Sequence, residues 1–396
     1  MGGEVVSAKK LFWALASTAF LAASGLAHAD NTSEVKQPLW FKEPSAYLQE
    51  KARLDDLSNI VVGEGPKGEE GVLYSDIKIT DEQAAKIKAG NFTVAIALGW
   101  LGDDWAQQQL IGLKEQFGKL GIKVIAETNA NWDDSRQISD LATVSVLKPN
   151  LVVSFPLNAQ TTASAYKELA DAGTKIVFMD QIAEGMEPGK DYVSMVSSDN
   201  HALGMNIADM LSDAIGGKGD VGALYYAPDF YVTNVRYEGF IARLRAKHPD
   251  VRLVVASGHN GPNKGQEVTQ GLLARYPDLK GLYGSWSIPA MGAVTAASVA
   301  GRAPEDFRIV NENFDHIVAA NMAENGYIAG ISAQIPYFNG ITEAKLGALA
   351  LIGEKVPSFV VIPPLKVTRN NLAESYQKIY RAELPAEIKT ALDASQ

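Results

Sequence analysis

Apolar runs alternate with amphipathic segments along most of the chain, beginning at residue 92. The first four runs occupy residues 92–98, 122–127, 151–155 and 175–180. Each run is apolar throughout instead of alternating, which is typical of strands that are covered on both faces. The segments between them have helical spacing, as at Leu110, Leu113, Phe117 and Leu120. This order predicts parallel strands joined by helices.

A second set of runs repeats the pattern at residues 221–227, 251–256, 279–284, 307–311 and 327–333. Helical stretches at 232–247 and 290–300 lie between these runs. We therefore predict an α/β protein with two similar doubly wound parallel-sheet lobes. In such folds a ligand binds at the carboxyl ends of the strands, here in the gap between the lobes.

Residues 30–90 have a different composition, with mixed charges, prolines and the turn-rich stretch "VVGEGPKGEEG" at 61–71. A short apolar cluster at Leu39, Trp40 and Phe41 interrupts the polar sequence. We interpret this region as an N-terminal extension that packs onto the main body through these aromatic rings. A partly ordered arm is the alternative.

The first residues have the pattern of a secretory signal peptide. Lys9 and Lys10 precede an apolar run at 11–26, and Ala27-His28-Ala29 fits a cleavage site. We expect residues 1–29 to be removed after Ala29 and the mature chain to reside in the periplasm. No other stretch approaches the roughly 20 apolar residues of a membrane span.

Charge and composition narrow the classes of function. A net charge of -10 disfavours nucleic acid as a partner, and the lack of cysteine excludes disulfides and thiolate metal sites. "GKGDVG" at 217–222 precedes a strand, whereas a dinucleotide-binding loop follows one. "NANWDDSRQISD" at 129–140 lacks the glycine and glutamate of a calcium loop and is better explained as a capped helix start.

The histidines do not have metal-ligand spacing, and "GSWSI" lacks the final glycine of a nucleophile elbow. We therefore predict no catalytic residue, metal or cofactor, and a protein that is not an enzyme. Polar and aromatic side chains instead follow the ends of several predicted strands, where they would meet at one edge. These candidates for ligand binding are Trp100, Asp103, Asp104, Trp105, Asp180, Gln181, Phe230, Asn234, Arg236, Trp286, Asp315 and Gln334. Either Asp103 or Asp104 is also suited to cap the helix that begins near Trp105.

Residues 92 to about 370 resemble the ribose-binding type (type I) of periplasmic sugar-binding proteins, the receptors of ABC importers. The similarity lies in "TVAIALGWLGDDW", "KIVFMDQ", "VSSDN", "NVRYEGF", "NFD" and "AQIP", in this order. It implies a hinge with three crossings, near 198–200, 334–336 and 363–364. The lobes would then be 91–198 with 335–363, and 199–334 with 364–396.

The resemblance also implies roles for single residues. Trp105 corresponds to the aromatic ring that stacks on the sugar, and Asp180 to the aspartate of an Asp-Arg pair whose arginine is here Gln181. The helix arginine matches Asn234 or Arg236, and a second aromatic ring falls near Asn260, with Phe230 as a substitute. Trp286 replaces an asparagine, while Asp315 and Gln334 match an aspartate and a glutamine.

These features predict a monomeric receptor that closes over a small sugar or polyol and delivers it to an ABC permease in the inner membrane. The long extension is also similar to relatives that present a ligand to a membrane histidine kinase, so a sensor adaptor is the alternative. The carboxylates fit neutral hydroxyls, with Asp104 engaged at the helix cap. Together with three tryptophans they would also fit a cation such as a methylated amine. We favour the neutral ligand.

Overall fold

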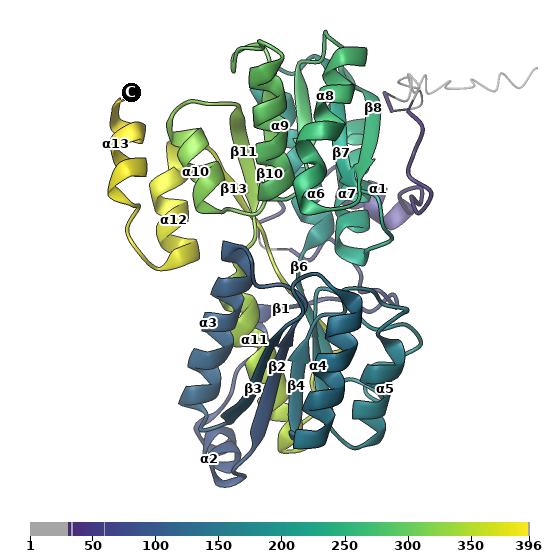
Figure 1. Cartoon of the computed structure of the whole chain (residues 1–396), viewed down its shortest axis with the longest axis vertical. Helices are drawn as coiled ribbons and strands as arrows, with labels where there is room; N and C mark the ends of the chain where they lie inside the picture. Colours follow the sequence, from purple (N-terminus) through teal and green to yellow (C-terminus); the bar gives the residue numbers. More distant parts are fainter. Residues whose placement is uncertain (1–30, 33–34, 59, 395–396) are drawn as a thin grey trace, which may run out of the picture.

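The computed structural model describes residues 31–32, 35–58 and 60–394, which form two lobes stacked along the long axis of the molecule (Figure 1). The predicted signal peptide lies outside these residues. Among the described helices, none combines the length and apolarity needed to cross a membrane.

The first lobe is built on a seven-stranded parallel sheet. Its strands, in spatial order, are β1 (Val72–Leu73), β12 (Phe359–Ile362), β6 (Ser194–Ser198), β5 (Lys175–Met179), β4 (Leu151–Ser154), β2 (Thr93–Leu98) and β3 (Lys123–Asn129). The helices associated with this sheet are α2 (Asp81–Ala89), α3 (Asp104–Lys119), α4 (Asp134–Leu147), α5 (Ala163–Asp171) and α11 (Pro336–Leu351).

The second lobe has a six-stranded sheet in which only the edge strand β13 runs antiparallel to its neighbour. The order is β13 (Leu365–Val367), β11 (Ile328–Ala333), β10 (Arg308–Glu312), β9 (Gly281–Gly284), β7 (Gly219–Tyr226) and β8 (Val251–His259). Its helices are α6 (Asn200–Ala214), α7 (Tyr231–Lys247), α8 (Gly265–Arg275), α9 (Ser287–Val299), α10 (His316–Ala323), α12 (Leu372–Tyr380) and α13 (Ala386–Ala394).

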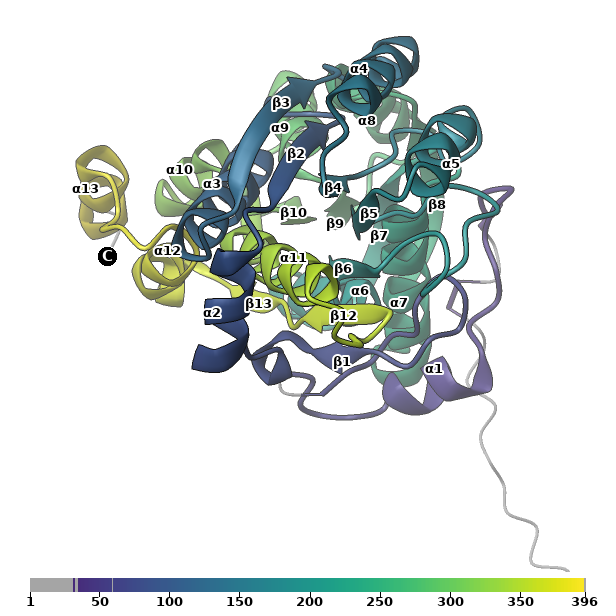
Figure 2. The same ribbon diagram turned by 90° about the horizontal axis from the view of Figure 1, so that it is seen from below.

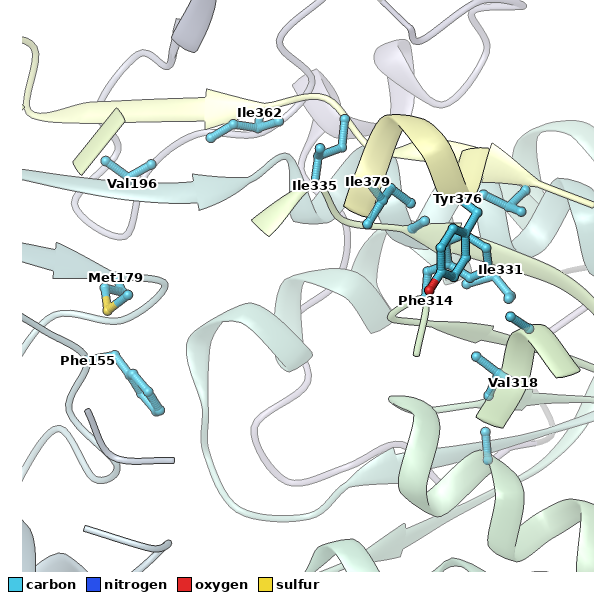
Figure 3. Packing of buried hydrophobic residues seen from close by; sticks show 14 of the residues in the cluster. Phe155, Met179, Val196, Phe314, Val318, Ile331, Ile335, Ile362, Tyr376 and Ile379 are labelled. Carbon is cyan, nitrogen blue, oxygen red and sulfur yellow. The ribbon is translucent and has the colours of Figure 1, made fainter. Parts of the chain in front are cut away.

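The chain crosses between the sheets after β6, after β11 and after β12. Buried side chains continue along these crossings, and Figure 3 shows Ile335 and Ile362 next to the apolar residues of both lobes. The predicted α/β fold with two doubly wound lobes and three crossings is therefore confirmed. The edge strands β1 and β13 and the inner strands β12 and β6 were not among the predicted apolar runs, because they are short or rich in serine.

Strand burial explains why the runs are apolar from end to end. All four residues of β4 and five of the six of β2 are buried, since helices cover both faces of the sheet (Figure 2). Helix starts are set by local capping. Asp133 accepts a hydrogen bond from the Arg136 amide at 2.9 Å, so the segment 129–140 contains a capped helix start, as predicted.

The N-terminal extension contacts both lobes. Trp40 and Phe41 pack edge-on against Tyr237 of α7, and the Trp40 Nε1 donates to the Ala227 carbonyl at 3.0 Å. The extension also contains the short helix α1 (Ala46–Lys51), seen beside α7 in Figure 2. Farther along, β1 joins the edge of the first sheet by pairing with β12.

Candidate functional site

A cavity lies between the lobes. The centres of water molecules can occupy a volume of about 70 Å³ inside it. One water needs about 10–15 Å³ on this measure, so several waters or one small ligand would fit. The cavity is lined by Trp100, Asp103, Trp105, Trp132, Phe155, Asp180, Tyr226, Phe230, Val232, Thr233, Arg236, Pro262, Trp286, Asn313 and Gln334. Seven of these side chains are aromatic. Flat rings of this kind can cover the apolar faces of a small polar molecule.

The loop after β2 and the first turn of α3 place two tryptophans, Trp100 and Trp105, in the wall of the first lobe. Asp103 caps α3 by accepting from the Ala106 amide at 3.0 Å, and its other oxygen accepts from the Trp100 Nε1 at 3.1 Å. The Trp105 Nε1 donates to the Gln334 Oε1 at 3.2 Å, and its ring lies edge-on to Phe155 at 5.9 Å. Both indoles are therefore fixed before a ligand arrives.

Trp132, from the loop after β3, contacts the second lobe across the cavity. Its ring centroid lies 6.3 Å from that of Trp286 and 6.4 Å from that of Tyr226. Its backbone has a φ of 63°, a left-handed conformation that is uncommon for a bulky residue and frequent at functional sites. The Trp132 amide donates to the Gly99 carbonyl at 2.9 Å, which ties the two first-lobe loops together.

Gln334, at the second crossing, connects several parts of the site. Its Oε1 accepts from the Ser198 Oγ at 3.0 Å as well as from Trp105, and its Nε2 donates to the Asn313 Oδ1 at 2.6 Å. Because Ser198 ends a first-lobe strand and Asn313 follows a second-lobe strand, this amide bridges the two lobes. We infer that its geometry depends on how far the lobes close.

Asp180 and Arg236 provide the buried charges. Asp180 has a φ of 55°, and its Oδ1 accepts from the Ser197 Oγ at 2.6 Å. Burial raises the pKa of Asp180, although the nearby Arg236 guanidinium acts in the opposite direction. Arg236 lies on α7, which approaches α6 so closely that a Cβ at Gly204 would overlap the Arg236 carbonyl oxygen. This close packing fixes the position of the arginine.

His259 lies behind Trp286, with ring centroids 4.9 Å apart, and its Nε2 is 2.7 Å from the Ser285 Oγ. Burial lowers the pKa of His259 to about 4, so the imidazole is neutral at neutral pH. Its neutral ring packs against that of Trp286. Among the described residues, no group of three or more acidic, histidine or cysteine side chains is arranged to hold a metal ion.

Eight of the thirteen predicted residues line the cavity, and five do not. The eight are Trp100, Asp103, Trp105, Asp180, Phe230, Arg236, Trp286 and Gln334. Asn260 is exposed in the loop after β8 and has no place in the cavity wall. Pro262 and Tyr226 contribute to the wall near this position.

Gln181 and Asn234 line a groove outside the cavity, beside the extension. Asn234 donates to the Asp229 Oδ1 at 2.6 Å, while Arg236, two residues farther along α7, faces the cavity. Two residues turn a helix by about 200°, so only one of the two can face inward. Gln181 accepts from the Tyr231 amide at 3.1 Å and so joins the lobes.

Asp104 and Asp315 line a smaller space next to the cavity. Asp104 does not cap α3, because Asp103 does so. Instead the Asp104 Oδ2 accepts from the His316 amide at 2.9 Å, from the His316 ring and from the Tyr380 hydroxyl at 3.1 Å. The assignment of Asp104 to the helix cap is therefore wrong, and the residue connects α3 to the second lobe.

Sequence reasoning missed seven residues of the wall: Trp132, Phe155, Tyr226, Val232, Thr233, Pro262 and Asn313. Five of them carry the same signal as the predicted residues, because they end or closely follow strands β4, β7, β3, β8 and β10. Applying the strand-end rule to every strand would have found them. Val232 and Thr233, in the first turn of α7, had no such signal.

The family described as "Periplasmic binding protein domain" matches residues 94–355, well over half of the chain. The chain belongs to this family. It is 24% identical over 286 residues to the ribose import binding protein of Salmonella typhimurium, covering 72% of this chain and 93% of the relative. The Bacillus subtilis ribose import binding protein is also 24% identical, over 69% of this chain and 86% of its own length.

Solved structures show the same fold. An ABC transporter solute binding protein from Agrobacterium vitis, bound with alpha-D-tagatopyranose, has a TM-score of 0.67 at 24% identity and covers 74% of this chain and 99% of its own. A carbohydrate transporter solute binding protein from Agrobacterium radiobacter, in complex with D-arabinose, has a TM-score of 0.66 at 24% identity, with coverage of 73% and 99%. The fold is thus that of the type I periplasmic binding proteins.

Proposed function

We propose that this protein is a periplasmic solute-binding receptor that closes over a small polyhydroxy ligand, a sugar or polyol, and delivers it to an ABC permease. The observation that carries the proposal is the cavity between the lobes, where seven aromatic rings surround a few polar side chains. Rings that cover CH faces and polar groups that read hydroxyls are what such a ligand requires. The names of the relatives, which include ribose, arabinose and tagatose binders, support this ligand class.

We further propose that the mature chain acts in the periplasm as a monomer and catalyses no reaction. Ligand binding would shift the population toward the closed arrangement of the lobes, since only that arrangement presents both walls to one molecule. The residues that we assign to ligand binding are the eight predicted residues of the cavity wall, together with Trp132, Tyr226 and Asn313. The groups on both lobes would make the closed state the one with the higher affinity.

A thermal-shift screen of residues 30–396 tests the proposal with pentoses, hexoses, polyols and methylated amines. A ligand at 100 times its Kd adds about 2.7 kcal/mol of stability, which is easily detected. We expect one sugar or polyol to raise the melting temperature and to change the fluorescence of the cavity tryptophans. Binding of a methylated amine, with every sugar and polyol inert, would contradict the proposal.

A further inference from the structure

Arg236 is the only lysine or arginine that lines the cavity within the described part of the chain, and a buried carboxylate engages it. Its Nη1 forms an ion pair with the Glu312 Oε1 at 3.1 Å, and its Nε donates to the Asn200 Oδ1 at 2.7 Å. The side chain of Glu312 is fully buried and that of Arg236 nearly so. Glu312 ends β10 and does not line the cavity.

Arg236 also lies within the electrostatic reach of a second carboxyl group. Asn200 donates to the Ser197 Oγ at 2.7 Å, and Ser197 donates to Asp180 at 2.6 Å. The chain of contacts thus runs from Glu312 through Arg236 to Asp180. Burial raises the pKa of Glu312 and of Asp180, and the attraction of Arg236 opposes this rise at both. One cation is therefore shared between two desolvated carboxyl groups.

Nearby groups add acidic character without adding a cation to the wall. Asp103 lines the cavity, whereas Asp315, just beyond it, is only partly ionised at neutral pH because burial raises its pKa to about 7. His259 is neutral at neutral pH, because burial lowers its pKa to about 4. A ligand carboxylate would enter a space with more acid than base and with little water to screen it. Like charges brought together in such a poorly hydrated space are strongly disfavoured.

We propose that Glu312 is a positioning residue for specificity: it engages Arg236, and the cavity therefore accepts neutral or cationic sugars and rejects sugars that carry a carboxylate or phosphate. An arginine without such a partner would do the opposite, because its planar guanidinium binds carboxylate and phosphate groups in a bidentate manner. This inference rests on the proposed function, because it concerns which members of the sugar class enter the cavity.

Calorimetry with matched sugars tests the inference. The probes are D-glucose, D-glucosamine and D-glucuronate, the same three forms of D-galactose, and D-ribose with D-ribose 5-phosphate. For whichever series binds, we expect the anionic form to bind roughly 100-fold more weakly than the neutral form. Glu312→Gln should reduce this ratio by about tenfold, since it releases Arg236 without changing the side-chain volume.

The matched control is Glu127→Gln, which removes one negative charge from an exposed ion pair with Lys114. We expect this control to leave the ratio unchanged. Equal affinity for the neutral and anionic forms in the unmodified protein would overturn the inference, and this measurement decides the matter even if Glu312→Gln fails to fold. If Glu312→Gln and Glu127→Gln have the same ratio of neutral to anionic affinity, Glu312 does not control this specificity.

If no sugar binds, the proposed function fails, and the charge of the cavity is then measured separately. Iodide, caesium and acrylamide are anionic, cationic and neutral quenchers of tryptophan fluorescence. Relative to acrylamide, iodide should quench Glu312→Gln more efficiently than Glu127→Gln, because both variants remove one charge but only one of them alters the cavity. Identical quenching of the two variants would overturn the inference.

Discussion

Asp103 and Asp104 are neighbours in the sequence, yet they belong to two regions with different behaviour. Asp103 lies in the cavity, and within the described residues its side chain bonds to its own loop and helix, at Trp100 and Ala106. Asp104 lies outside the cavity and contacts His316 and Tyr380 of the second lobe. We refer to Asp104, His316, Tyr376 and Tyr380 as the outer contact. Figure 3 shows Tyr376 beside Phe314, which precedes His316 by two residues.

The difference separates two contributions to closure. In the cavity, we propose that a ligand would bridge the lobes. In the outer contact, the protein joins its own lobes without any ligand. Burial raises the pKa of Asp104, but its hydrogen bonds to His316 more than compensate, so the pKa lies below the ordinary value. An ionised Asp104 thus favours the closed arrangement, and the ligand needs to supply only the rest.

The largest expected effect concerns Asp315, which lies between the two regions. Burial, together with the nearby charge of Asp103, raises the pKa of Asp315 from 3.8 to about 7. The folded protein therefore retains a proton between these pH values where the unfolded chain has lost it, so this residue makes stability fall as pH rises from about 4 to 7. Asp315→Asn should remove that fall and raise the free energy of unfolding at pH 8 by up to about 4 kcal/mol.

Urea unfolding at pH 4.5 and pH 8 measures this effect, and Asp171→Asn, a surface carboxylate paired with Lys167, is the control. The control should shift stability by less than about 0.5 kcal/mol at either pH. If the free energy of unfolding changes with pH in the same way in Asp315→Asn and in the unmodified protein, Asp315 is ionised in the folded state.

Next in size is the loss of the stacking face in the cavity. Trp105→Ala should weaken ligand binding by about 3 kcal/mol, or roughly 100-fold, because the indole is fixed in advance by Gln334 and Phe155. Isothermal titration with the sugar found in the screen checks this value. Trp40→Ala, which alters an aromatic residue of the extension, should leave the affinity unchanged. Unaltered binding by Trp105→Ala would show that the ligand does not use this wall.

A smaller effect is expected at the outer contact. Asp104→Asn removes an interlobe charge without altering the cavity wall. It should therefore raise the population of the open arrangement and lower the affinity for the ligand by about three- to tenfold. Small-angle scattering of the ligand-free protein should show a larger radius of gyration. Glu115→Gln is the control, because its interlobe pair with Arg381 is solvent-exposed and worth little. An equal effect of the two changes would erase the distinction between the regions.

The smallest effect is that of salt on a neutral ligand. Raising the ionic strength from about 0.05 to 0.5 M should change its Kd by less than about twofold, since no net charge is transferred into the cavity. Titrations at several salt concentrations measure this dependence. A strong weakening by salt would indicate that a ligand cation interacts with Asp103 or Asp180.

Most of the architecture was predictable because most of the parallel strands that are covered on both faces are apolar throughout, the serine-rich β6 being an exception. Residues 92–98 and 151–155 show this directly, and β2 and β4 lie there. Strand ends also predicted much of the site, including Trp105, Asp180 and Trp286, since carboxyl ends of parallel strands meet at one edge. Short edge strands such as β1 escaped detection because two residues carry too little pattern.

The sequence pattern by itself therefore determined the two lobes and the chemical kind of residue that surrounds the cavity, while the hinge crossings followed from the resemblance to a known family. Tertiary structure decided which neighbour faces inward: Asp103 and not Asp104, and Arg236 and not Asn234. It also brought Glu312, a buried strand residue, into contact with Arg236 across 76 positions of sequence. These choices depend on the rotation of each helix and on how the lobes close, and long-range packing sets both.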